Sequence, residues 1–163
     1  YSNAAIVCSV TPADYGKNLF DGMNFQENLE KKSYQIANNY TGLSQTLFDY
    51  LSNKVSKNKI NTSYKLPTYN CDLNDVLPDF INKNIKNAFD SWKRNKHFVS
   101  KQANIIGLET RTSAPIRILR DLNDISVNVK NLMPIGEGAG YAGGIVSAAI
   151  DGIRVVDKNF TRE

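Results

Sequence analysis

The chain has 163 residues, 41% of them hydrophobic, and 20 Lys and Arg against 16 Asp and Glu give a formal net charge of +4. This length and composition predict a globular domain with a core and exclude a disordered or fibrous chain. The small excess of positive charge gives no strong attraction to polyanions, so we expect no nucleic-acid partner. Asp151 and Arg154 interrupt the longest apolar run, so we expect no membrane span.

Two cysteines, Cys8 and Cys71, lie far apart without a CxxC spacing. This spacing argues against a zinc site and against a redox dithiol, so we expect reduced thiols and no metal. The first residue is Tyr1, and the short apolar run at residues 4–10 has no basic flank, which argues against a signal peptide. We therefore expect a piece of a longer or processed cytoplasmic polypeptide.

The first third of the chain predicts one strand and two helices. Residues 4–10 (AAIVCSV) are β-rich and predict a buried strand, ended by a Pro and Gly turn. Residues 25–37 have the periodicity of an amphipathic helix, and residues 44–53 predict a second helix capped by Ser44. Residues 52–72 are polar and rich in turn formers, which predicts a surface loop.

A long helix is predicted to start near Pro78, because apolar residues recur at helical spacing. Its opposite face is basic, which is typical either of a solvated face or of a nucleic-acid surface. We favour the solvated face, because the aromatic Phe89 and Trp92 belong to the apolar stripe. His97 is expected at the end of this helix in a structural or surface role. The apolar stripe consists of Leu77, Phe80, Ile81, Ile85, Ala88, Phe89 and Trp92, and the basic face of Lys83, Lys86, Lys93 and Arg94.

The periodicity changes to two over residues 105–113, which predicts a strand with one polar face carrying Glu109 and Arg111. Pro115 ends this strand, and residues 116–121 (IRILRD) predict a second extended piece in which Arg117 faces away from the isoleucines.

The stretch at residues 132–144 combines a predicted buried strand, LMPI, with the glycine-rich loop GEGAGYAGG. The loop contains the GxGxxG spacing of a dinucleotide fingerprint, but only 20 residues follow Gly143, too few for a helix and a second strand. No Lys-Ser/Thr pair follows, which excludes a Walker A phosphate loop. Two interpretations remain: a structural tight turn, or a segment that closes a cofactor site begun elsewhere, with helix-start amides toward the ligand.

The helix predicted after this loop has a single polar stripe, formed by Ser147, Asp151, Arg154 and Lys158, and is apolar almost everywhere else. Ala148, Ala149 and Gly152 would let it pack close to a sheet. The preceding sequence lacks the alternating strands and helices of such a sheet. We therefore expect the partner strands to come from the rest of a longer polypeptide or from a second copy.

The segment GEGAGYAGGIVSAAIDGIRV resembles the C-terminal flavin-binding segment of FAD-dependent dehydrogenases of the glutathione-reductase-like superfamily, in the group described as uncharacterised NAD(FAD)-utilising dehydrogenases. The stretches NAAIVCSVTPADYG, GMNFQENLEKKSYQIA and IIGLETRTSAPIRILRD resemble the same group in the same order. The resemblance covers most of the chain and is weakest over residues 52–72. The N-terminal GxGxxG that binds the ADP part of FAD in this group is absent.

The resemblance implies that the glycine loop lies at the flavin and that Glu137 holds the ribityl chain. The cofactor contacts that it implies are Gly136, Glu137, Gly138, Gly143, Gly144 and Ile145. On the substrate side, a guanidinium could stabilise a reduced flavin or clamp an acidic substrate, and an aromatic ring could stack on the flavin. The candidates are Glu109, Arg111, Arg117 and Tyr141, each of which also has an ordinary structural interpretation.

These inferences predict an α+β chain: a substrate-side region at residues 1–125, and a strand and helix at residues 126–163 that complete a Rossmann-like FAD domain. The parent protein is then an FAD-dependent oxidoreductase with a small-molecule substrate, and NADH or NADPH is a candidate electron donor. The isolated chain, which lacks the N-terminal FAD-binding half, is expected to be inactive and free of FAD. The alternative is a non-catalytic interaction domain that associates, as a homo-oligomer or with another chain, through its apolar C-terminal helix.

Overall fold

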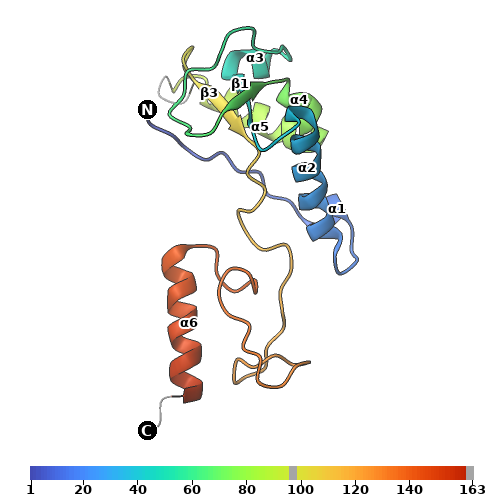
Figure 1. Ribbon diagram of the computed structural model, residues 1–163, viewed down its shortest axis with the longest axis vertical. Helices are drawn as coiled ribbons and strands as arrows, with labels where there is room; N and C mark the ends of the chain where they lie inside the picture. The colour runs from blue at the N-terminus through green and yellow to red at the C-terminus, as the bar shows by residue number, and fades with distance from the viewer. Residues whose placement is uncertain (96–98, 161–163) are drawn as a thin grey trace. The chain divides into compact units, whose positions relative to one another are not determined.

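The computed structural model of the protein describes residues 1–95 and 99–160 (Figure 1). His97, which the sequence places at a helix end, lies outside the described residues. The chain divides into two compact units, unit 1 with residues 1–14 and 27–109, and unit 2 with residues 15–26 and 110–163. The elements in chain order are α1 (Pro12–Tyr15), α2 (Asp21–Ala37), β1 (Gly42–Thr46), α3 (Leu47–Leu51), β2 (Thr68–Asn70), α4 (Leu73–Val76), α5 (Asp79–Trp92), β3 (Asn104–Gly107) and α6 (Ile145–Phe160).

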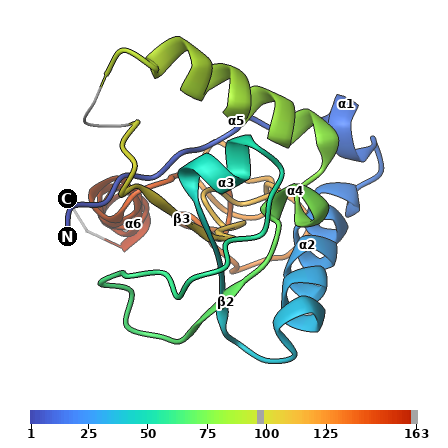
Figure 2. The ribbon, with the colours of Figure 1, turned by 90° about the horizontal axis from the view of Figure 1, so that it is seen from above.

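Unit 1 is built on a three-stranded mixed sheet in the order β2-β1-β3, visible beside α3 and α4 in Figure 2. The central strand β1 runs parallel to β2, with Leu43 opposite Tyr69, and antiparallel to β3, with Leu43 opposite Gly107. Its three middle residues are fully buried. The sheet thus joins segments from three separate parts of the sequence, and the expectation of a mixed helix and strand fold is confirmed for this unit.

The core of unit 1 lies where short helices cover this sheet. Leu43, Tyr50, Leu73 and Val76 form its fully buried centre. The hydroxyl of Tyr50 donates to Asn82 Oδ1 at 2.9 Å, and Asn82 itself is 7% exposed. The partly buried hydrophobic residues packed around the centre are Ile36, Ala37, Leu51, Cys71, Leu77, Ile85, Ile105 and Leu108.

The three long helices predicted from periodicity are confirmed, since α2, α5 and α6 lie where their apolar residues recur. Helix α2 begins at Asp21, four residues before the predicted start. In α5 the stripe is buried at Ile81 and Phe89, whereas Trp92 is exposed. The loop expected over residues 52–72 is present, with the short strand β2 near its end.

Residues 42–46 correct the prediction of a helix capped by Ser44. They form the strand β1, and the helix α3 that follows begins at Leu47 with Thr46 as its N-cap. Ser44 and Gln45 are fully buried, yet each has hydrogen-bond partners on neighbouring segments. Because these long-range partners satisfy the polar side chains, the strand outweighs the local preference for a helix.

The strand predicted at residues 4–10 does not form, and this segment is mostly exposed, with Val7 65% exposed. The strand predicted over residues 105–113 stops at Gly107, and residues 132–135 are also irregular. A strand requires a neighbour for its backbone hydrogen bonds, and among the described residues no strand pairs with residues 4–10, 108–113 or 132–135. Residues 116–120 are irregular except for a single bridge from Arg120 to Ser126.

Unit 2 consists of residues 15–26, the irregular segment 110–144 and the helix α6, and it contains none of the named strands. The inward face of α6 is small and polar. Ala148 lies against Gly136, Gly152 lies against Ile135, and Asp151 and Val155 are buried. None of the described helices is both long and apolar enough to cross a membrane.

Candidate functional site

The glycine-rich loop, residues 136–144, forms a series of turns before α6 (Figure 1). Gly140 has a φ of +83°, and a Cβ there would lie 2.5 Å from the carbonyl oxygen of Ile116, so glycine is required at this position. Gly136 also has a positive φ, +72°, and is buried. Its N–H donates to Asp151 Oδ2 at 2.9 Å, and its carbonyl accepts from the N–H of Tyr141. The start of the loop is therefore fixed by the fold itself.

Gly138 and Gly143 differ from these two glycines, because nothing in the fold requires them. Neither has a positive φ, and a Cβ at either position would meet no atom within 4 Å. Gly144 has only Ser147 Oγ near its Cβ position, at 3.5 Å. Glu137 and Ile145 are exposed on either side of these glycines, Ile145 to 93%. This part of the loop presents bare backbone to its surroundings, as a loop does where a ligand or another chain approaches closely.

An ionic network fixes the loop to α6. Its centre is Arg120, whose side chain is 7% exposed and whose guanidinium binds Asp151 through two nitrogens, at 2.8 and 3.1 Å. The Nε of Arg120 lies 2.9 Å from Asp124 Oδ1, and Nη1 donates to the Pro134 carbonyl at 3.0 Å. We refer to Arg120, Asp124, Asp151, Arg154 and Lys158 as the Arg120 network, since the last two also contact its carboxylates.

The network keeps both of its carboxylates ionised. The bidentate bond from Arg120 holds the pKa of Asp151 well below its usual range, against the opposing effect of burial and with help from the Gly136 N–H. For Asp124 burial acts to raise the pKa, but the hydrogen bond from Lys158 and the charges of Arg120 and Arg154 outweigh it, so the pKa is lowered. At neutral pH the charges of this buried cluster are thus paired with opposite charges.

The face of α6 that turns inward carries Asp151 of the polar stripe together with Ala148, Gly152 and Val155, whereas Ser147, Arg154 and Lys158 are exposed. The apolar face is the one that the described chain leaves open. The sequence predicted a helix buried on most of its surface, with small residues against a sheet. In the structure Ala148 and Gly152 pack on the chain's own loop. The apolar face of α6, as we call it, is exposed and consists of Ile145, Val146, Ile150, Ile153, Val156 and Phe160.

Two of the substrate-side candidates, Arg117 and Tyr141, lie close together, and Tyr141 belongs to the loop itself. Arg117 Nε donates to the Gly140 carbonyl at 3.0 Å, and its guanidinium carbon lies 5.1 Å from the centre of the Tyr141 ring. On Tyr141 the Arg120 guanidinium stacks at 3.6 Å, and the hydroxyl donates to the Ile118 carbonyl at 3.1 Å. Because Arg120 occupies one face of this ring, Tyr141 has a structural role in unit 2.

The other two candidates are exposed, Glu109 at the end of unit 1 and Arg111 near the start of unit 2, and both make interactions within the protein. Sequence reasoning missed Arg120, which pairs with an aspartate 31 positions away. The available signal was Asp151, an acidic residue inside an otherwise apolar helix, which needs a buried cation. In the described ranges no three His, Cys, Asp or Glu side chains converge as metal ligands would.

Comparison with known proteins assigns the chain to a family. Residues 1–112 match the family described as "FAD-dependent protein, C-terminal domain-like", so the chain belongs to that family and is a flavoprotein-related domain. A protein of Clostridium beijerinckii, named "Uncharacterized protein", is 37% identical over 161 residues, which cover 96% of this chain. The chain spans 30% of the length of that relative.

Proposed function

We propose that this chain is the C-terminal part of an FAD-dependent oxidoreductase and that its glycine loop closes the flavin side of the cofactor site. Membership of the FAD-dependent C-terminal family is the observation that carries the proposal. The loop lies beyond the matched residues 1–112, within the part of the chain that the resemblance to NAD(FAD)-utilising dehydrogenases covers. The bare backbone of Gly138 and Gly143 supports its assignment to the cofactor.

The residues of the loop fit a flavin nucleotide. The first backbone N–H groups of α6 have no partner carbonyl one turn earlier in the helix, so they suit the electron-rich edge of a ligand. Gly138, Gly143 and Gly144 leave room for close approach, and the exposed carboxylate of Glu137 can accept hydrogen bonds from hydroxyl groups such as those of a ribityl chain. FAD, when bound, supplies the electron transfer, and this chain positions it.

Gly136 cannot offer a backbone hydrogen bond to a cofactor. Both of its polar groups are taken within the chain, so it would contact a cofactor through van der Waals contact alone. Ile145, which is almost fully exposed, would contribute an apolar contact at the helix start. The Arg120 network acts indirectly, because it sets the distance between the loop and the helix.

For the substrate side we propose residues 1–125, with residues 126–163 belonging to the FAD domain. Arg117, held at the Gly140 carbonyl, is the candidate nearest to the loop for binding an acidic small-molecule substrate. Glu109 and Arg111 stay candidates for the same work. As in the sequence analysis, we propose a reduced nicotinamide nucleotide as the electron donor and a cytoplasmic location.

The partner that this proposal requires is the N-terminal FAD-binding half of the same polypeptide. Its sheet would cover the apolar face of α6 and complete a Rossmann-like domain. The length of the Clostridium relative, of which this chain spans 30%, supports the existence of such a half. Burying six large apolar side chains would contribute about 1.5–3 kcal/mol for each one that becomes fully buried.

One observation favours a second candidate function. The same exposed apolar face would suit a non-catalytic interaction domain that binds another protein or another copy of itself. Such a domain would need neither the bare glycines nor Glu137. A substitution in the glycine loop should therefore weaken FAD binding if the chain is part of a flavoprotein, and should have no such effect if it is an interaction domain.

The test is the flavin absorbance of the full-length protein with Glu137→Ala. Loss of hydrogen bonds to a charged acceptor should weaken FAD binding by about tenfold to a hundredfold, whereas Glu137→Gln, which keeps an acceptor oxygen, should weaken it less. Glu27→Ala, at an exposed ion pair with Lys31, is the matched control and should leave the flavin bands unchanged. Bleaching of those bands by NADH or NADPH would identify the electron donor.

A full-length protein that is colourless and takes up no added FAD would overturn the flavin proposal and favour the interaction domain. A flavoprotein whose FAD affinity is unchanged by both Glu137→Ala and Glu137→Gln would keep the family assignment but remove Glu137 from the cofactor site.

A further inference from the structure

Positive charge is concentrated in two segments of unit 1, residues 51–71 and 91–108. Together they carry eight of the 20 Lys and Arg residues and none of the 16 Asp and Glu residues, so the other 124 residues have a net charge of −4. The excess of positive charge in the whole chain thus comes from these two segments. The net charge of the whole chain is small although positive and negative charges are concentrated in different parts of the sequence.

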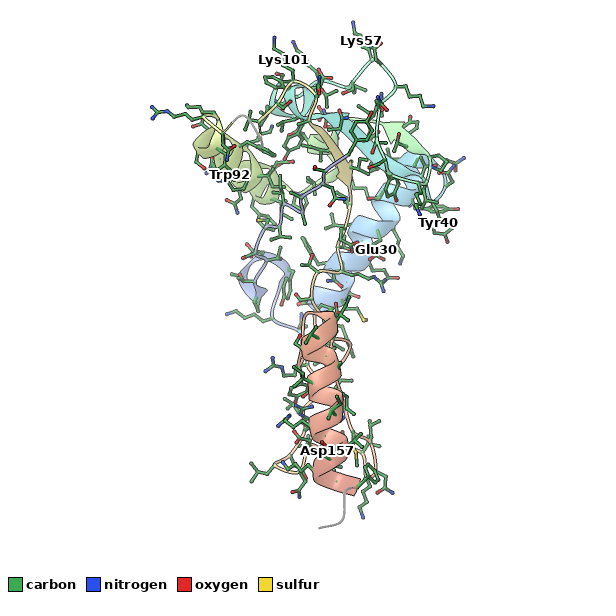
Figure 3. All side chains as sticks on the ribbon, turned by 90° about the vertical axis from the view of Figure 1, so that its left-hand side faces the viewer. Glu30, Tyr40, Lys57, Trp92, Lys101 and Asp157 are labelled. Carbon is green, nitrogen blue, oxygen red and sulfur yellow. The ribbon has the colours of Figure 1, made fainter. Side chains whose placement is uncertain are left out.

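The fold brings parts of both segments to one cavity in unit 1, with a volume of about 900 Å³. Asn104 Nδ2 donates to the Asn61 carbonyl at 2.9 Å and joins the two segments at its edge. Figure 3 shows Lys57 and Lys101, one from each segment, on neighbouring loops with their side chains directed outward. The cavity is lined by Tyr1, Thr46, Asp49, residues 54–61, Gln102 and Asn104.

The lining combines cations, amides and apolar groups. Lys54, Lys57 and Lys59 are exposed, and Asn and Gln side chains from both segments lie among them. The carboxylate of Asp49 is hydrogen-bonded to the protein itself, because its Oδ2 accepts from the hydroxyls of Thr46 at 2.8 Å and Ser56 at 2.6 Å. The lining therefore holds three ammonium groups and one carboxylate whose hydrogen-bonding capacity is already used in part.

These groups suit a ligand with several negative charges. Three ammonium groups, each a point charge with three donors, favour more than one negative charge on the ligand, and lysine is a common ligand of phosphate. Val55, Ile60 and Tyr1 add surface for a carbon skeleton or a ring. A volume near 900 Å³ lies within the range of small-molecule sites, about 300–1,000 Å³.

We propose that this cavity binds an organic phosphate, a small molecule with two or more negative charges. The site lies in unit 1 and consists of residues other than those assigned to the flavin, so its test is independent of the cofactor proposal. In an oxidoreductase it would hold the anionic part of a substrate or of a regulatory metabolite.

The test is calorimetric titration of the full-length protein, with and without excess FAD in the solution, with ADP and with inorganic pyrophosphate as probes. Both should bind, ADP more tightly because of its organic part, and added salt should weaken both. The triple variant Lys54→Gln, Lys57→Gln, Lys59→Gln should weaken binding by about tenfold or more, since each lysine contributes charge-assisted hydrogen bonds. The corresponding triple change to Arg should retain binding.

The matched control is Lys17→Gln, Lys83→Gln, Lys130→Gln, which removes the same charge from exposed positions outside the cavity and should change affinity less than about twofold. Equal losses in the two Gln variants would overturn the proposal, because they would show an effect of net charge alone. Absence of saturable binding to the wild type would overturn it as well. Tighter binding of a single-stranded oligonucleotide than of ADP, lost in the cavity variant, would replace it with a nucleic-acid surface.

Discussion

At the scale of single residues, unit 1 is organised by buried polar groups that find partners far along the chain. Gln45 is fully buried, donates to the Lys54 carbonyl and accepts from the Leu73 N–H. Tyr50, at the centre of the core, donates to Asn82, and burial raises the pKa of its phenol to about 12, so the donor proton is kept at any physiological pH. Each such group stabilises the fold only while its partner is present.

Tyr50→Phe tests this dependence. The change keeps the ring but leaves the buried Asn82 Oδ1 without its donor, so the free energy of unfolding should fall by about 1–3 kcal/mol. Urea unfolding monitored by far-UV circular dichroism measures the loss. Tyr69→Phe, at an exposed position of β2, is the control and should stay within about 0.5 kcal/mol of the wild type. Equal effects of the two substitutions would show that the Asn82 contact contributes nothing.

The residues of the candidate site were predictable to different degrees. The glycine loop stands out in the sequence because five glycines fall within nine residues, and glycine has few other reasons for such density. The pairing of Arg120 with Asp151 was not predictable, because an ion pair between residues 31 apart leaves no periodic signal. The lysines of the cavity were visible as a polar loop, but their convergence with residues 102–104 required the fold.

At the scale of elements, the three long helices were predictable, whereas of the strands only the start of β3 was. A helix closes its hydrogen bonds within one segment, so the periodicity of α2, α5 and α6 was sufficient. A strand depends on a neighbour, and the β1 segment, with Ser44 and Gln45 at its centre, has the composition of a helix or a cap. Conversely, the apolar residues 4–10 have β-like composition but no strand neighbour among the residues that the structure describes.

The attachment of α6 predicts a pH dependence. Because the pKa of Asp151 is lowered in the folded protein from its ordinary 3.8, the stabilisation is present at neutral pH and is lost as the pH falls below that value. The difference in unfolding free energy between the wild type and Asp151→Asn should therefore be large at pH 7 and shrink below about pH 4. This difference is measured by chemical denaturation of the full-length wild type and variant at a series of pH values, monitored by hydrogen exchange in α6.

Asp90→Asn is the control for this series. Asp90 forms an ion pair with Lys93 in which both side chains are mostly exposed, so its effect should be at most about 1 kcal/mol at any pH. An effect of Asp151→Asn that stays constant from neutral to strongly acidic pH would contradict the assigned role of its charge.

At the scale of the whole molecule, the main feature is a helix with two contrasting faces. The inward face of α6 is small and charged and is bound by the chain's own loop, whereas the apolar face is exposed. The sequence indicated both the apolar surface and the need for a partner outside the chain. It did not indicate that Asp151 would be buried, since that depends on its pairing with Arg120.

The exposed face predicts self-association of the 163-residue chain when it is produced alone. Sedimentation velocity over a concentration series should show oligomers that dissociate on dilution, and Ile150→Asp with Ile153→Asp should shift the chain to monomer, because both side chains are more than half exposed on this face. Lys83→Asp with Lys130→Asp, at exposed positions elsewhere, should leave association unchanged.

The full-length protein separates the two candidate functions in the same experiment. If the N-terminal half covers the apolar face of α6, this face should be inaccessible in the full-length protein. The aspartate substitutions at Ile150 and Ile153 should then lower the stability of the protein and leave its oligomeric state unchanged. An isolated chain that is monomeric at all concentrations would contradict the role given to this face.

Salt should act in opposite directions on the two sides of α6. Dissolved ions screen the half-exposed Arg154 and Lys158, so their ion pairs with Asp124 weaken as ionic strength rises. Salts such as sulfate strengthen apolar association instead, so the proposed contact of the apolar face should tighten under the same conditions. Under the proposed function, the helix is held by charge on one side and by the exclusion of water on the other, so a rise in salt would weaken the inner contacts and strengthen the outer ones.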